Sequence, residues 1–292
     1  MAQNNKIADY ITFPTTFETY RWYKPILVMI ISFIAMFILI GITTLAYSTI
    51  FGQGFIINVF RGGIESLSNS NNIFFADLII IMFIPALYIA SRIVKDRPFS
   101  SYSSSRGGWN FKLYFKALVI PIILFVAYGL INAFISGSKG TANISIGFIL
   151  VLLISIPLQS IAEEYLFRGL ILQTLGSWFK IPVLAIILQA IIFAIVHGYN
   201  NAGFIEMLVS GLICGFFAWK TNGIEVSSAI HTANNFSVGL LVMLGLHTST
   251  SNPQLSSVLG VIAFEIILFI ILYYVGKKTD WFGEIPENSE KL

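Results

Sequence analysis

The sequence predicts an all-α membrane protein whose chain crosses the bilayer eight times. The 292 residues are 56% hydrophobic and only 11% charged, with a mean hydropathy of +0.82, whereas a soluble domain carries about 25% charged residues. The apolar residues gather into long runs, and a helix needs about 20 of them to cross the hydrocarbon core of a bilayer. Both observations indicate a polytopic helical protein.

Eight apolar runs qualify, or nearly qualify, as membrane spans. They are residues 25–50, 73–93, 113–135, 145–162 with an extension, 182–198, 203–219, 223–246 and 256–276.

The basic residues test this count, because cytoplasmic loops are enriched in Lys and Arg. With eight spans, all but two of the 17 basic residues fall on one side of the membrane, and only Arg61 and Lys139 fall on the other. Adding or removing one span would destroy this separation. The sequence therefore predicts a multi-pass protein of the cell membrane with the N- and C-termini in the cytoplasm.

A Ser-rich connection at residues 95–112 is the clearest break in the chain. The two spans before it hold little polarity beyond Asp77, whereas spans four to seven hold nearly all the polar side chains. We therefore expect a peripheral N-terminal part, a core that carries the functional residues, and a short C-terminal tail. The expected boundaries are 1–112 for two helices and the cytoplasmic loop, 113–276 for the core with its motif region at 145–245, and 277–292 for a cytoplasmic tail.

Several classes of function are disfavoured by what the sequence lacks. No basic cluster suggests a nucleic-acid partner, and the single Cys214 excludes an intrachain disulfide or a multi-cysteine zinc site. No internal repeat is seen, which argues against the inverted-repeat architecture of many transporters. The expected partner is instead the lipid bilayer and a substrate that reaches the protein from it.

Span four runs into the stretch AEEYLFRG, which contains Glu163, Glu164 and Arg168. Side chains four residues apart share a face of a helix, so Glu164 and Arg168 are expected to form an ion pair. Glu163 is rotated by about 100° from Glu164 and has no local partner, which suits a general base. Pro157 is expected to kink the same helix.

An alternative for this stretch is that Ser160 and Glu163 form a capping box that starts a new cytoplasmic surface helix. Arg168 would then be an ordinary cation on the inner side. The two interpretations remain equally open on this stretch alone.

Two histidines lie on other polar helices of the same region. His197 follows Phe193 by one turn near the end of span five, and His231 precedes Asn235 by one turn in span seven. The imidazole and amide of the second pair can bind water, a metal or an oxyanion, although they could also serve only to join helices. His197 could instead be an interfacial or satisfied core residue. His247, the third histidine, is expected at the outer interface.

Helix geometry places these residues near one another. At about 1.5 Å per residue, Glu163 and His197 can approach across an antiparallel hairpin of spans four and five. His231 reaches the same level if that hairpin extends about two turns into the cytoplasm. We therefore expect one buried site on helices four, five and seven, next to a span-six helix whose Gly211 and Gly215 permit close packing.

The three motifs Glu-Glu-x-x-x-Arg, Phe-x-x-x-His and His-x-x-x-Asn occur in this order on successive helices. The chain thereby resembles the CAAX-protease and bacteriocin-processing (CPBP) family of intramembrane proteases, also called the Abi family. The resemblance covers about residues 145–245, and no motif position departs from the pattern.

The resemblance implies a catalytic set and a reaction. It implies that Glu163 and His197 activate a water molecule, that His231 and Asn235 stabilise the oxyanion, and that Glu164, Arg168 and Phe193 support them. Relatives are often described as metalloproteases, and Glu163, His197 and His231 could form an open zinc site, yet the chain lacks His-Glu-x-x-His. Both mechanisms stay open, and we favour the metal-free one.

The resulting hypothesis is an intramembrane endopeptidase that cleaves a peptide, or a lipidated or membrane-anchored protein, near the cytoplasmic leaflet. Processing of bacteriocin or pheromone peptides, or bacteriocin immunity, would suit such an enzyme. One alternative is an ion-coupled transporter that uses the same buried groups as a proton relay. Another is a non-catalytic immunity or cell-wall regulatory membrane protein.

Overall fold

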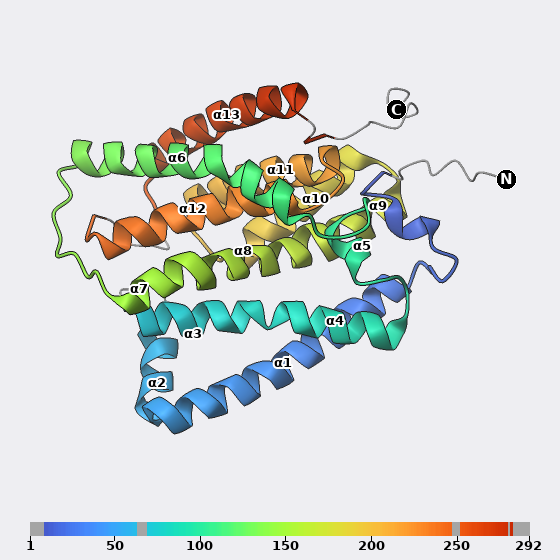
Figure 1. Cartoon of the computed structure of the whole chain (residues 1–292), viewed down its shortest axis with the longest axis horizontal. Coiled ribbons are helices and arrows are strands. Elements are labelled where there is room, and N and C mark those ends of the chain that lie inside the picture. The colour runs from blue at the N-terminus through green and yellow to red at the C-terminus, as the bar shows by residue number, and fades with distance from the viewer. Residues whose placement is uncertain (1–8, 63–68, 247–251, 280, 283–292) are drawn as a thin grey trace.

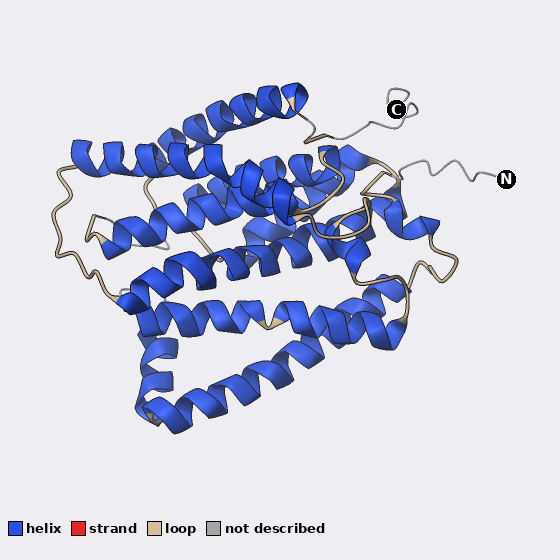
Figure 2. Ribbon diagram, in the orientation of Figure 1, coloured by secondary structure: helices blue, strands red, loops and turns tan. Residues whose placement is uncertain are grey.

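The computed structural model describes residues 9–62, 69–246, 252–279 and 281–282. This part of the chain is helical, with no β-strand (Figure 2) and one isolated bridge between Ser104 and Gly223. The N-terminal elements are η1 (Phe13–Thr16), α1 (Lys24–Phe51), α2 (Gln53–Gly62), α3 (Ser70–Ile81), α4 (Phe83–Val94), α5 (Ser100–Ser103) and α6 (Phe111–Ile135). They are followed by α7 (Ile146–Leu150), η3 (Val151–Ser155), α8 (Ile156–Glu164), η4 (Tyr165–Leu172), α9 (Gln173–Phe179), α10 (Pro182–Val196), α11 (Asn201–Lys220), α12 (Glu225–Met243) and α13 (Leu255–Lys278).

The long helices lie side by side along the longest axis of the molecule (Figure 1). In this view α1 crosses at an angle at one edge, and α13 lies at the opposite edge. The composite helix from α7 to α9 occupies the interior between α3–α4 and α12. It therefore places the AEEYLFRG stretch inside the bundle.

All eight predicted spans are helical, but they are not equally suited to cross a membrane. Within the described residues, six helices are long and apolar enough, and α10 and α12 are not among them. α10 has only 15 residues, and α12 carries many polar side chains. The six spans are Lys24–Phe51, Ser70–Val94, Phe111–Ile135, Ile146–Phe179, Asn201–Lys220 and Leu255–Lys278.

The loops gather at the two ends of the bundle. At one end, Trp178 Nε1 donates to Trp22 O, Ser104 Oγ to Asn222 O, and Arg106 Nη2 to Trp281 O. At the other end, the Asn143 amide donates to Met243 O and Asn200 Nδ2 donates to Pro253 O. The basic connections thus share one end. Lys6, His247, Lys291 and most of the expected tail lie outside the described residues.

The helix that carries the two glutamates is continuous but irregular. Residues 146–179 form one helix that contains two π-helical segments, η3 just before Pro157 and η4 around Arg168. Pro157 cannot donate a backbone hydrogen bond, and the π-helical segment η3 lies in the turn that precedes it. The capping-box interpretation is wrong, because Ser160 lies inside α8 and the helix does not restart there.

The two-helix N-terminal part packs directly against this central helix. Phe75 and Phe83 are buried, and Ser155 Oγ donates a hydrogen bond to Asp77, the one acid inside the second span. A polar contact between an acid of α3 and the π-helical turn η3 therefore joins the N-terminal part to the central helix.

Candidate active site

The Glu164–Arg168 pair forms as the spacing predicts. Arg168 Nη1 lies 2.6 Å from Glu164 Oε1, and neither side chain is exposed to solvent. Arg168 Nη2 donates to Gly211 O at 3.3 Å, and its guanidinium lies 4.6 Å from the centre of the Phe193 ring. A buried charge is tolerated only when it is paired and hydrogen-bonded, and each of these contacts meets part of that need.

His231 joins the two glutamates. Its Nδ1 lies 3.0 Å from Glu164 Oε1, and its Nε2 lies 3.6 Å from Glu163 Oε2. The imidazole is 10% exposed and the Glu163 side chain 14% exposed, whereas Glu164 is fully buried. The hydrogen bond between Nδ1 and Glu164 fixes the orientation of the ring and directs Nε2 towards Glu163.

One carboxylate oxygen of Glu163 accepts a hydrogen bond, and the other accepts none from the described residues. Gln159 Nε2 donates to Oε1, whereas Oε2 has no hydrogen-bond donor among the described residues although it is buried. An unsatisfied buried carboxylate oxygen is costly and needs an explanation. A free lone pair beside an oriented imidazole is the arrangement expected of a group that accepts a proton.

Asn235 reaches the same cluster through Gln159. Its Nδ2 donates to Gln159 Oε1 at 3.0 Å and to Ser160 Oγ at 3.3 Å. Gln159 thus connects the amide of α12 to the carboxylate of Glu163. Glu163 therefore has a local partner, contrary to the prediction. Gln159 lies four residues before it on the same face of the helix, and this spacing is the signal that could have identified it.

His197 lies beside this cluster without a direct bond to it. It caps α10, and its Nδ1 is 2.7 Å from Phe193 O. The Phe193 ring contacts both imidazoles, at centroid distances of 4.4 Å to His197 and 6.1 Å to His231. In the part of the chain that the structure describes, no hydrogen bond or ion pair joins His197 to Glu163.

The acidic and imidazole side chains of the described residues do not form a metal site. No three His, Cys, Asp or Glu side chains among the described residues come together in an arrangement that could hold a metal ion. Glu163, His197 and His231, the ligands of the zinc alternative, are therefore not gathered into a ligand set, and we derive no step through a metal.

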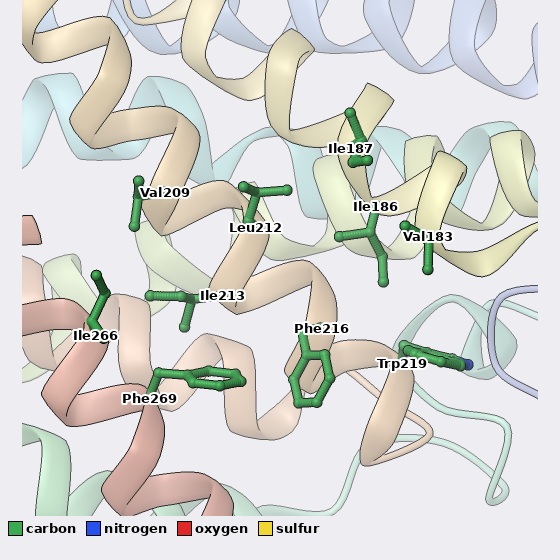
Figure 3. A pocket seen from close by; sticks show the side chains of 10 residues that line it. All are labelled: Val183, Ile186, Ile187, Val209, Leu212, Ile213, Phe216, Trp219, Ile266 and Phe269. Atoms are coloured by element: carbon green, nitrogen blue, oxygen red, sulfur yellow. The ribbon is translucent and has the colours of Figure 1, made fainter.

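An apolar cavity lies away from these groups. A space of about 420 Å³ between α10, α11 and α13 is lined only by apolar side chains, including Val183, Leu212 and Phe269 (Figure 3). None of the polar residues above lines it. The cavity therefore takes no part in the chemistry of the polar cluster.

Residues 145–237 match a family model described as type II CAAX prenyl endopeptidase Rce1-like. This segment, about a third of the chain, is similar to that family. The matched segment begins at the start of the central helix and ends just after Asn235, so it contains every residue of the polar cluster described above. This agrees with the CAAX-protease resemblance and supports a peptidase as the class of activity.

A curated bacterial protein is also similar to the chain. The chain is 28% identical over 176 residues to "Uncharacterized protein YyaK" of Bacillus subtilis (strain 168), a match that covers 56% of this chain and 59% of that protein. The chain thus spans less than two thirds of the length of this relative. No solved structure matches the chain.

Proposed function

We propose that this protein is an intramembrane endopeptidase that hydrolyses a peptide bond with a water molecule activated by Glu163. The observation that carries the proposal is the buried Oε2 of Glu163, which accepts no hydrogen bond from the described residues and lies 3.6 Å from His231 Nε2. A carboxylate with a free lone pair can take the proton of an attacking water and then give it to the leaving amine as the peptide C–N bond breaks. The Rce1-like match over residues 145–237 supports peptide hydrolysis as the reaction.

His231 acts on the oxyanion in this proposal. A protonated imidazole has an N–H on each ring nitrogen, so Nδ1 stays on Glu164 while Nε2 donates to the charge that develops on the carbonyl oxygen. Such preorganised donors are effective because they need no reorganisation when the charge develops. Glu164 and Arg168 do not touch the substrate and hold the imidazole in place.

Asn235 and His197 complete the site after small movements. The contacts of Asn235 Nδ2 with Gln159 and Ser160 use both of its N–H groups, so the amide must release one of them to bind an oxyanion. His197 has its Nδ1 on Phe193 O and must bring Nε2 towards Glu163 to share in water activation. Substrate binding between α10 and α12 is the step that we expect to cause both movements.

The proposed substrate is a peptide, or a lipidated or membrane-anchored protein, whose scissile bond enters the bundle from the bilayer. Apolar side chains cover the outer faces of the long helices, so a substrate that is already anchored in the membrane needs no soluble route to the site. Bacteriocin and pheromone precursors are members of this class that belong in a substrate panel.

The test is cleavage of a panel of prenylated, acylated and unmodified peptides by the full chain reconstituted in lipid. Loss of a general base lowers turnover by about 10²- to 10⁴-fold, so Glu163→Gln should lose that much activity with unchanged yield and melting temperature. Glu206→Gln is the matched control, since it makes the same isosteric change in α11 outside the polar cluster. Normal cleavage by the Glu163 variant would contradict the proposal.

Two further experiments distinguish a metal-free peptidase from a metal-dependent one and from a transporter. Each reaction is repeated with a strong chelator, because activity that survives chelation argues for metal-free water activation. The same proteoliposomes are assayed for proton uptake. Proton movement without cleavage of any peptide would favour the ion-coupled transporter instead.

A further inference from the structure

The cytoplasmic-loop end of the central helix is held by a buried polar cluster that the proposed chemistry does not use. We call Tyr10, Asp96, Arg97 and Tyr102 the clamp. Their exposed fractions are 0, 1, 5 and 0%, respectively. Two opposite charges and two phenols in the interior need specific partners there, so their contacts indicate what they stabilise.

The members of the clamp first bind one another. Arg97 Nε lies 3.5 Å from Asp96 Oδ2, and its guanidinium lies 3.8 Å from the centre of the Tyr102 ring. The Tyr102 hydroxyl donates to Asp96 at 2.9–3.0 Å, and the Tyr10 hydroxyl donates to Tyr102 O at 2.7 Å. Burial raises the pKa of both phenols well above the ordinary value, so they remain donors.

The clamp then binds the π-helical segment η4. Arg97 Nη2 donates to Gly169 O at 3.3 Å, and Arg97 Nη1 donates to the side chain of Gln173. The Tyr10 hydroxyl also lies 3.4 Å from Arg168 O. These contacts fall on two consecutive carbonyls of a segment that departs from α-helical hydrogen bonding, and π-helical turns of this kind are frequent at functional sites.

Close backbone contact explains two glycines of the same helix. A Cβ added at Gly169 would lie 2.8 Å from Tyr102 O, and one added at Gly176 would lie 2.7 Å from Ile11 O. Residues seven apart share a face of a helix. The α5 segment and the N-terminal segment therefore pack closely on the backbone of the central helix at these two glycines.

The clamp is linked to the polar cluster through Arg168. The Arg168 backbone carbonyl faces Tyr10, while its side chain binds Glu164, which in turn binds His231. We propose that Arg97 and Tyr102 are positioning residues that fix the backbone of η4, so that Arg168 holds Glu164 against Nδ1 of His231. The effect on turnover rests on the proposed function, whereas the effect on His231 does not.

The test uses the full chain in lipid with ¹⁵N-labelled histidine, observed by solid-state NMR. The chain has three histidines, and the His231 signals are assigned from their loss in His231→Gln. Arg97→Lys keeps the charge but cannot make the planar two-pronged contact, and Tyr102→Phe removes only the hydroxyl. Both should shift the Nδ1 signal of His231, and Arg92→Lys, on the exposed face of α4, should not.

Turnover provides the second readout. A small misplacement caused by a residue away from the chemistry can cost up to about 100-fold, so Arg97→Lys should lower kcat at least tenfold while KM changes less than twofold. A lower melting temperature with an unmoved His231 signal would overturn the proposal, since the clamp would then be merely structural. If the wild-type chain cleaves no peptide, the proposed function fails, and the His231 signal still decides the role of the clamp.

Discussion

At the scale of single residues, the Glu164–Arg168 pair makes the strongest prediction about stability. Both side chains are fully buried, and breaking a buried ion pair from one side costs about 3–5 kcal/mol because the remaining charge has no counterion. Glu164→Gln and Arg168→Met should each destabilise the chain by about this amount, and the double variant by less than the two costs added together. Unfolding in mixed detergent micelles measures all three.

Arg92→Met is the control for the arginine substitution, because Arg92 is exposed at the end of α4 and such changes usually stay within about 0.5 kcal/mol. Additive costs in the double variant would show that the two charges do not stabilise each other, which would contradict the pairing.

The residues of the site show where sequence reasoning ends. The Glu164–Arg168 contact is local and follows from helical spacing, so it could be predicted without knowing the fold. His231 contacts both glutamates, and Glu164 lies 67 residues away from it in the sequence. Such contacts depend on which helices are neighbours, and residue spacing within one helix does not determine this. His197 was predicted from its motif to act with Glu163, but its side chain binds the Phe193 carbonyl instead.

At the scale of elements, the central helix departs from the pattern that predicted it. Hydrophobic periodicity and Pro157 indicate a kinked helix, but no residue preference distinguishes a π-helical turn from an α-helical one. The segments η3 and η4 therefore could not be predicted. Their position follows from tertiary contacts, with Asp77 on Ser155 at η3 and Arg97 on Gly169 at η4.

Helix α11 confirms the prediction of close packing at Gly211 and Gly215. A Cβ on Gly211 would lie 3.0 Å from the Cα of Ala190 in α10, and the Gly211 carbonyl accepts from Arg168 and from Gln189. Gly211→Val should separate the two helices and cost about 1–3 kcal/mol, the usual cost of overpacking. It should also lower peptidase turnover, because it displaces the carbonyl that Arg168 binds.

Gly41→Ala is the matched control for this substitution. Gly41 lies in α1 with no atom within 4 Å of the added Cβ, and alanine favours a helix over glycine by about 1 kcal/mol. The control should leave stability unchanged or slightly raised. Equal stability of the two glycine variants would contradict close packing of α10 on α11.

At the scale of the whole molecule, the connections that carry the basic residues share one end of the bundle. The eight crossings that the charge distribution favours stay a prediction. The direct packing of the N-terminal part on the central helix could not be predicted, since Asp77 and Arg97 are single polar residues whose partners lie more than 70 residues away. The composition of a segment indicates whether it forms an apolar helix, but it does not indicate which other helices pack against it.

The number of crossings is the property of the whole molecule that most needs a test. Helix α10, with 15 residues, is about 22 Å long, and α12, with 19 residues, is about 28 Å long, against a hydrocarbon core of about 30 Å. If both cross, Lys139 and Asn201 lie outside and Lys180 and Lys220 lie in the cytoplasm. If neither crosses, Asn201 and Lys220 exchange sides, while Lys139 and Lys180 keep theirs.

Single cysteines report these sides directly. Cys214 is the one cysteine in the sequence and is buried, so Cys214→Ala provides a background without cysteine. In intact cells, an impermeant maleimide should label Lys139→Cys and Asn201→Cys and should reach Lys180→Cys and Lys220→Cys only after permeabilisation, because basic loops stay in the cytoplasm. Labelling of Lys220→Cys in intact cells, with Asn201→Cys protected, would replace the eight-span topology with six crossings.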